Sequence, residues 1–279
     1  MSESARQLCD LHIHSNFSDS DADIESIFKQ AKEKNLHCIA ITDHDTVSGI
    51  PLARDCTGRY GVQLIEGLEL SAQHQGLEIH VLGYFVDSDS LYLKKQLDSV
   101  RDIRRQRMLD MAKALNAIGV EVDIKELLEA IGMAMPTRLH LGLYLLGKGK
   151  VATLWEAFKK YLAPGRPAYV AGFKYSVKDA IEVIKKSGGL SFLAHPHMIS
   201  NQAWVKEFID FGLDGLEINY SNMSPVKKIL YTQMASEHNL LKSGGSDAHG
   251  SYKEFTQVGK VTVPYEWVQA MKGRLERKK

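Results

Sequence analysis

Two short motifs rich in metal-binding side chains stand near opposite ends of this chain. The first is Asp10-Leu-His12-Ile-His14, and the second is Asp247-Ala-His249. Imidazole and carboxylate groups are the ligands that borderline and hard divalent metals take from proteins. Further candidates of the same two types stand between these motifs: His44, Glu69, His80 and His195. Because this set exceeds the needs of one ion, the sequence predicts a multinuclear metalloenzyme.

Strand-like and helix-like segments alternate along much of the chain, which predicts an α/β fold with a parallel sheet. The strand candidates are residues 7–14, 37–42, 63–71, 78–85, 190–194, 215–219 and 240–243. The clearest helix candidates are residues 23–35 and 176–186, and 78–85 could form a hairpin with 63–71. In α/β barrels, catalytic groups lie at the C-terminal ends of the strands. Most candidate ligands stand at such ends, so we expect them to converge on one face.

The segment from residue 91 to residue 167 interrupts this alternation. Val100, Met108, Met111 and Leu115 recur at helical spacing, and further helix signals follow them. We therefore predict an all-helical lid domain, residues 91–167, inserted into a barrel made of residues 1–90 and 168–279.

Composition restricts the setting of this chain of 279 residues. Its net charge of +1 argues against electrostatic binding of duplex DNA. The cysteines are Cys9, Cys38 and Cys56, and their odd number favours free thiols in a reducing compartment. The sequence shows no secretion signal and no apolar run of membrane-spanning length. We expect a cytoplasmic protein without a membrane partner, and the oligomeric state is left open.

The motifs, in their order along the chain, resemble those of the PHP (polymerase and histidinol phosphatase) superfamily. The matching segments are Asp10-Leu-His12-Ile-His14-Ser, Ile41-Thr-Asp43-His44-Asp-Thr, Gly67-Leu-Glu69-Leu-Ser, Ala194-His195-Pro and Ser246-Asp247-Ala-His249. This resemblance implies a distorted, TIM-like (β/α)7 barrel with a phosphoesterase centre of two or three divalent metals. Mn²⁺ is favoured, and Zn²⁺, Fe²⁺ or Mg²⁺ also suit mixed nitrogen and oxygen ligands.

The resemblance also implies a metal ligand set. The implied ligands are His12, His14, Glu69 and Asp247 for a first ion, Glu69 with His80 and His195 for a second, and Asp19, His44 and His249 for a third. A structural role stays open for His80, which begins a strand, and for Asp19, which could cap a helix. Asp10 and Asp43 are expected to orient ligating imidazoles.

The expected chemistry is direct hydrolysis of a phosphoester. Cations about 3.5–4 Å apart lower the pKa of a water molecule between them and neutralise phosphoryl oxygens. We assign the catalytic roles to Glu69, Asp247 and His249, with attack by metal-activated hydroxide. No Gly-x-Ser-x-Gly elbow, Walker loop or catalytic-cysteine motif is present, so no covalent nucleophile is expected.

The substrate is predicted from residues 91–167. Thr137-Arg138-Leu-His140 and Tyr161-Leu-Ala-Pro-Gly-Arg166-Pro resemble the TrpH-like branch, which includes 3′,5′-nucleoside bisphosphate phosphatases and the exoribonuclease RNase AM. This resemblance implies that Arg138, His140 and Arg166 bind substrate, a small phosphorylated nucleotide (a 3′,5′-nucleoside bisphosphate or AMP-like) or the 5′-phosphorylated end of a short RNA. Arg101, Arg104 and Arg105 are expected to form a solvated basic helix face.

Three alternatives remain. A histidinol-phosphate phosphatase would use the same metal core, although the helical insertion disfavours it. An amidohydrolase also carries His-x-His on a barrel, but often with a carboxylated lysine as the bridging ligand. A non-catalytic PHP scaffold would bind metal without hydrolysing a phosphoester.

Overall fold

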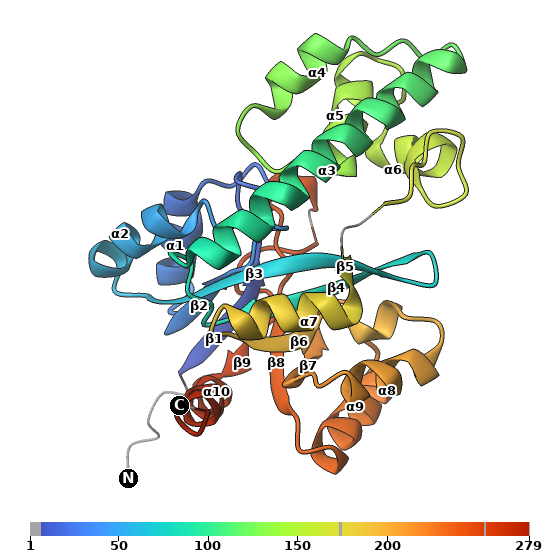
Figure 1. Ribbon diagram of the computed structural model, residues 1–279. Helices are drawn as coiled ribbons and strands as arrows, with labels where there is room; N and C mark the ends of the chain where they lie inside the picture. The colour runs from blue at the N-terminus through green and yellow to red at the C-terminus, as the bar shows by residue number, and fades with distance from the viewer. Residues whose placement is uncertain (1–6, 173–174, 254, 279) are drawn as a thin grey trace.

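The protein, seen in a computed structural model that describes residues 7–172, 175–253 and 255–278, combines a curved sheet with surrounding helices (Figure 1). A group of helices from the middle of the chain lies to one side of the sheet. The predicted α/β fold is confirmed. Among the described residues, no helix has the length and apolar character needed to cross a membrane.

The strands form a single sheet. They are β1 (Leu8–Ile13), β2 (Cys38–Ile41), β3 (Gln63–His74), β4 (Leu77–Tyr84), β5 (Tyr175–Ser176), β6 (Leu190–Leu193), β7 (Gly215–Tyr220), β8 (Leu241–Gly245) and β9 (Val263–Pro264). In the described part of the chain, the sheet has nine strands in the order β8-β7-β6-β4-β3-β2-β1-β9, and β5 pairs with β3. Since β5 and β9 have two residues each, the longer strands correspond to the expected seven-stranded barrel.

The sheet nearly closes where β1 meets the chain that follows β8. The N–H of Asp247 donates to the carbonyl of His12 at 2.8 Å, and the N–H of His14 donates to the carbonyl of Ala248 at 2.9 Å. Gly245 makes this approach possible, because a Cβ atom there would lie 2.3 Å from the backbone nitrogen of His12. The two terminal motifs that carry predicted metal ligands are therefore joined directly by backbone hydrogen bonds.

Strand β4 distorts the barrel because it runs antiparallel to both of its neighbours, β3 and β6. The predicted hairpin of β3 and β4 is confirmed, with Ser71 opposite His80. Strand β3 extends to His74, three residues beyond the predicted end. The reversed direction of β4 brings the side chain of His80, near its start, beside the later part of β3, which carries Glu69.

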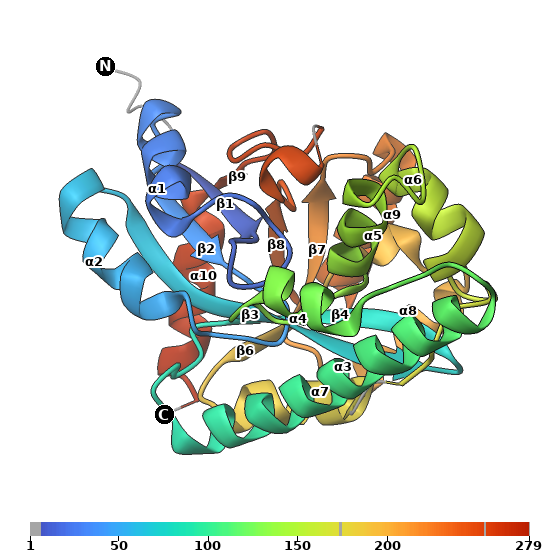
Figure 2. The same ribbon diagram turned by 90° about the horizontal axis from the view of Figure 1, so that it is seen from above.

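The helices surround the sheet (Figure 2). They are α1 (Ile24–Glu33), α2 (Ile50–Tyr60), α3 (Leu91–Ala117), α4 (Ile124–Ile131), α5 (Arg138–Gly147), α6 (Leu154–Ala157), η1 (Phe158–Leu162), α7 (Val177–Lys186), η2 (Pro196–Met198), α8 (Gln202–Asp210), α9 (Pro225–Glu237), η3 (Gly250–Tyr252) and α10 (Tyr265–Glu276). Both predicted helices are present. Asp23 caps α1, and Ser176 and Asp179 form a capping box at α7.

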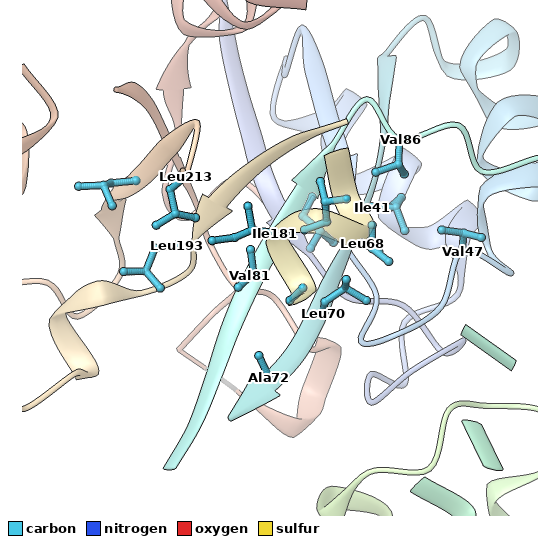
Figure 3. Packing of buried hydrophobic residues seen from close by; sticks show 14 of the residues in the cluster. Ile41, Val47, Leu68, Leu70, Ala72, Val81, Val86, Ile181, Leu193 and Leu213 are labelled. Carbon is cyan, nitrogen blue, oxygen red and sulfur yellow. The ribbon is translucent and has the colours of Figure 1, made fainter. Parts of the chain in front are cut away.

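Apolar side chains from the sheet and its helices form the barrel core. Ile41, Leu68, Val81 and Leu193 of the strands pack with Ile181 of α7 (Figure 3). All five are at most 2% exposed, so their burial holds the sheet against its helices and provides a rigid support for the strand ends.

The helices between β4 and β5 have a core of their own. Met108, Met111 and Leu115 in the later part of α3 pack there with residues of α4 and α5. In contrast, Leu93 and Val100 in the earlier part of α3 belong to the barrel core. One long helix therefore contributes to both cores, and it fixes the later helices relative to the barrel.

Arg104 lies on α3 between these two cores. Its guanidinium pairs with Asp45 at 2.6 Å and donates to the hydroxyl of Ser71 at 2.7 Å and to the carbonyl of Pro136 at 3.0 Å. Arg104 is 6% exposed, so the expectation that Arg101, Arg104 and Arg105 form a solvated basic face is wrong for this residue. Helical spacing reveals a shared face, but it does not show that another part of the protein covers that face.

Candidate metal centre

The predicted metal ligands converge at one end of the barrel. His12 lies in β1 and His14 follows directly after its last residue, Ile13. The two-residue spacing points both side chains to the same side, with their Nε2 atoms 3.1 Å apart. His44 follows β2 and forms an isolated bridge with Glu69 of β3. Thus β1, β2 and β3 deliver neighbouring ligands to a common position.

The carboxylate of Glu69 lies at the centre of this arrangement. Its Oε2 atom lies 3.4 Å from His12 Nε2, 3.3 Å from His14 Nε2 and 3.3 Å from His44 Nδ1, and its Oε1 atom lies 3.1 Å from both His80 Nδ1 and His195 Nε2. Since each oxygen faces a different set of rings, Glu69 has the geometry of a bridging ligand.

The ligand atoms fall into three overlapping groups. They are His12, His14, Glu69 and Asp247; His14, Asp19, His44 and His249; and His44, Glu69 and His80, with the ligand atoms of each group within 4.8 Å of one another. The first group has the membership expected for the first ion. The second holds the expected third-ion ligands together with His14. His195 adjoins the last group through Glu69 and lies 3.3 Å from His80.

These side chains satisfy the chemical requirements of divalent metal ions. His14 Nδ1, Asp19 Oδ1 and His44 Nδ1 are buried and have no hydrogen-bond partner. Leaving buried polar atoms unpaired is costly, and native proteins seldom do so without a purpose. Divalent cations would satisfy such nitrogen and oxygen atoms together, so the donor set fits the predicted metal centre.

The electrostatic environment favours the metal-binding protonation state of Glu69 and His249. At His12, His14 and His80, burial opposes the charged form, but the surrounding carboxylates raise the pKa of these imidazoles. Burial alone would raise the pKa of Glu69, but the nearby His80, His12 and His44 hold it well below its usual range. Burial, reinforced by the charge of His14, lowers the pKa of His249 to about 3. An ionised carboxylate and a neutral imidazole are the forms that coordinate cations.

Glu217 is a buried component of the centre that sequence reasoning missed. Its Oε1 lies 2.9 Å from Nδ1 of His12, and its Oε2 accepts the backbone N–H of His195 at 2.6 Å. The side chain is fully buried. A single glutamate in the otherwise apolar start of strand β7 was the available signal. Glu217 therefore orients His12 and positions the segment that carries His195.

Two further side chains contact the predicted ligand Asp247. The hydroxyl of Tyr220 donates to its Oδ2 at 2.6 Å, and Lys253 Nζ lies 3.0 Å from the same oxygen. Partial burial opposes the charge of Lys253, yet the adjacent Asp247 raises the lysine pKa above its usual value. These contacts leave the other oxygen, Oδ1, facing His12 and His14.

Asp10 and Asp43, which are expected to orient imidazoles, instead accept hydrogen bonds from serine and glycine residues. Asp10 accepts from the N–H and hydroxyl of Ser246 and from the N–H of Gly259. Burial raises the pKa of Asp10 to about 6 despite these hydrogen bonds. Asp43 accepts from the N–H and hydroxyl of Ser15. Both carboxylates therefore brace the loops that present the ligands, whereas Glu217 contacts an imidazole.

A cleft of about 420 Å³ separates the candidate centre from the helices of residues 91–167. Its lining includes Asp19, His44, His80, His249 and Lys253 from the centre, Arg104, Arg107 and Arg138 from the helices, and the aromatic Trp155 and Phe158. Positive charge and aromatic surface thus lie opposite the ligands. Such a combination suits phosphate oxygens and a nucleobase.

The predicted substrate-binding residues occupy different positions. Arg138 lines the cleft and pairs with Glu78 at 2.6 Å. His140 is not part of the cleft lining, and its Nδ1 accepts the N–H of Thr137 at the start of α5. Arg166 is exposed and also lies outside the lining. Sequence reasoning missed Arg107, which lies on α3 and lines the cleft.

Comparison with known proteins adds independent information on ancestry. The PHP domain matches residues 10–271. A 5′-3′ exoribonuclease Rnm from Salmonella typhimurium is 34% identical over 247 residues, covering 86% of this chain and 84% of the relative. A 3′,5′-nucleoside bisphosphate phosphatase from Chromobacterium violaceum is 29% identical over 256 residues, covering 90% of each chain.

A solved structure shows the same architecture. A protein from Bifidobacterium adolescentis, which carries the name metal-dependent phosphoesterase, superposes with a TM-score of 0.87 at 25% identity. The match covers 95% of this chain and 96% of that one. Because the match leaves out only about 5% of this chain, it includes most of the barrel and most of the helices between β4 and β5. Together with the match over residues 10–271, this agreement shows that the chain belongs to the PHP domain family.

Proposed function

We propose that this chain is a metal-dependent phosphoesterase that hydrolyses phosphate esters of nucleotides, including 3′,5′-nucleoside bisphosphates, AMP-like compounds and 5′-phosphorylated short RNA. The observation that carries the proposal is a continuous set of buried ligands that opens into an arginine-lined cleft. The names of the S. typhimurium and C. violaceum relatives support nucleotide and RNA substrates.

The residues assigned to metal binding are the nine predicted ones: His12, His14, Asp19, His44, Glu69, His80, His195, Asp247 and His249. Two or three divalent ions, with Mn²⁺ favoured, would be shared among them through Glu69. When bound, such ions supply Lewis acidity and make a nucleophile available at neutral pH. Glu69, Asp247 and His249 are the proposed catalytic residues because they would hold the metal ions that act on the water and the phosphate.

The other cleft residues bind and orient the substrate. Arg138 projects a guanidinium that can hold two phosphate oxygens at once, and Glu78 fixes its direction. Lys253 lines the cleft with its side chain 45% exposed, next to Asp247, so it can attract the phosphate. Trp155, 68% exposed, offers an aromatic face to a base.

We propose the domain roles on the same basis. Residues 1–90 and 168–279 form the metal-binding barrel, and residues 91–167 act as a substrate lid. The position of the cleft between the ligands and α5 and α6 supports this division. His140 would shape the start of α5, and Arg166 would reach only the outer part of a longer substrate.

The rival functions fit these residues less well. The central carboxylate belongs to Glu69, whereas many amidohydrolases use a carboxylated lysine as the bridging ligand. A non-catalytic scaffold has no use for a complete ligand set facing a charged cleft. A histidinol phosphatase would need no site for a second phosphate.

The deciding experiment is a matched substrate panel with added Mn²⁺. It contains adenosine 3′,5′-bisphosphate, AMP, histidinol phosphate and a 5′-phosphorylated short RNA. We expect the bisphosphate or the RNA to be hydrolysed with the highest kcat/KM. Preference for histidinol phosphate would contradict the proposed substrate class, and binding of metal without hydrolysis of any phosphoester would favour the scaffold.

A further inference from the structure

A second cleft, of about 300 Å³, also reaches the candidate centre. Glu78, His80 and Arg138 line both clefts, so the Glu78–Arg138 ion pair belongs to a wall that they share. The first cleft reaches His44 on one side of His80, whereas the second reaches His195. The ligand centre is therefore accessible along two different directions.

The second cleft differs from the first in its chemistry. Beyond the shared wall, its walls include Leu77 from the β3–β4 hairpin, Met198 from η2 and Trp204 from α8. Leu77 is 40% exposed and Met198 is 64% exposed. Exposed apolar side chains grouped beside a polar centre indicate a binding surface. An indole and a thioether suit the flat face of a nucleobase.

Two clefts at one centre provide space for two organic groups on the same phosphate. A phosphate monoester carries one organic group and needs one cleft. A phosphate diester carries two organic groups and needs space for both. The first cleft, which is lined by Arg104, Arg107 and Arg138, suits the nucleotide that carries a second phosphate. The second cleft is lined by no arginine other than the shared Arg138. We call it the apolar cleft, and it suits an uncharged base.

We infer that, during the proposed hydrolysis of 5′-phosphorylated RNA, the apolar cleft binds the second nucleoside, which lies beyond the scissile diester. This inference rests on the proposed phosphoesterase function. The bond between phosphorus and the 3′-oxygen of the first nucleotide breaks. Water supplies the hydroxyl group that phosphorus gains, and its remaining proton ends on the departing 3′-oxygen. The same bond breaks in a 3′,5′-bisphosphate, which leaves the apolar cleft empty.

The test compares two substrates that differ only beyond the scissile phosphate. They are a 3′,5′-nucleoside bisphosphate and the 5′-phosphorylated dinucleotide with the same first base. Met198→Glu places a negative charge in the apolar cleft at an exposed position, so the fold tolerates it. Met133→Glu is the matched control, because Met133 is 87% exposed and lies outside the lining of either cleft.

We expect Met198→Glu to lower the ratio of kcat/KM for the dinucleotide to kcat/KM for the bisphosphate by about tenfold or more, through loss of base contact. Met133→Glu should leave this ratio at its wild-type value. An unchanged ratio in Met198→Glu, or an equal loss on both substrates, would overturn the inference.

A binding measurement separates this inference from the proposed function. Calorimetry on chelator-treated protein, which cannot turn over substrate, gives the Kd of each compound. We expect Met198→Glu to weaken dinucleotide binding about tenfold relative to bisphosphate binding. Absence of hydrolysis by the wild-type protein with metal would refute the proposed function alone. Equal effects of Met198→Glu on the two Kd values would refute the apolar base site, whatever the activity.

Discussion

Glu217 Oε1 lies 2.9 Å from Nδ1 of His12, while Nε2 of the same ring lies 3.4 Å from Oε2 of Glu69. The carboxylate therefore occupies one ring nitrogen and leaves the other to face the candidate ligands. This relationship sets both the tautomer and the direction of the imidazole.

Glu217→Gln tests the role of this contact. Glutamine keeps the size of the side chain but removes the charge that favours a proton on His12 Nδ1. We expect a 10–100-fold loss of metal affinity or activity, the range typical of such outer partners. A competition assay with a metal indicator measures the affinity. The exposed carboxylate of Glu182 provides a control in Glu182→Gln, and equal affinities in the two variants would contradict the assigned role.

Glu69→Gln tests the bridging position. The change keeps the shape but removes the negative charge that faces the surrounding imidazoles. We expect phosphoester hydrolysis to fall by more than about a hundredfold. Mutation of a residue that only contacts a metal ligand already lowers metal affinity or activity 10–100-fold, and loss of a ligand should have a larger effect. The measurement is the steady-state rate together with bound metal per chain. Retained turnover in this variant or in Asp247→Ala would rule out the proposed mechanism.

Removal of metal should lower the thermal stability of the protein. Ligands that bind only the folded state stabilise it by about 2.7 kcal/mol at a hundredfold excess over Kd. For a chain of this size we expect Mn²⁺ to raise Tm by at least about 5 °C. Scanning calorimetry of chelator-treated and Mn²⁺-loaded protein measures the shift. Asp247→Asn should reduce the Tm shift that Mn²⁺ causes. If Mn²⁺ did not raise the Tm of the wild-type protein, this result would contradict the proposed metal centre.

Arg104→Ala should destabilise the protein strongly. The change leaves Asp45, which is fully buried, without its guanidinium partner. Breaking a buried ion pair in this way costs about 3–5 kcal/mol of the free energy of unfolding. Chemical denaturation provides the measurement. The neighbouring Arg105 is exposed, so Arg105→Ala should cost less than about 0.5 kcal/mol. Similar losses in both variants would show that the buried pair is unimportant.

Arg138→Met should impair substrates that carry two phosphates. Loss of hydrogen bonds to a charged group costs about 1.5–3 kcal/mol, which corresponds to a tenfold or larger fall in kcat/KM. A 3′-monophosphate that lacks the 5′-phosphate should be affected less, because it has no second phosphate to lose. Parallel kinetics on the two substrates measure the difference. Equal effects on both would place Arg138 away from the second phosphate.

The sequence predicted much of the barrel and the ligand set because both have local signatures. Apolar runs such as 38–41 identify buried strands, and the alternation of His12 and His14 shows a shared face. The extension of β3 to His74 was missed, because Gln73 and His74 are polar and only the pairing with β4 explains them. Strand ends depend on partners that are distant in the sequence.

The roles of individual charged residues around the cleft and the centre were less predictable, for a related physical reason. Arg104 and Arg105 are adjacent and chemically identical, yet only the first is buried. Their difference arises from Asp45, which is remote in sequence. Glu217 stands out as a lone carboxylate in an apolar strand, but the sequence does not show that it contacts His12. Contacts between distant segments decide such roles, and a single sequence does not encode them in its spacing.

Helix α3 places Leu93 in the barrel core and Met111 in the core of the later helices. Its continuity makes the two parts mechanically dependent, since neither can rotate away without bending or melting this helix. We therefore expect them to unfold together in one cooperative transition. The same feature limits protein engineering: a replacement for the helical insertion would have to retain the first half of α3, because side chains of that half pack in the barrel core.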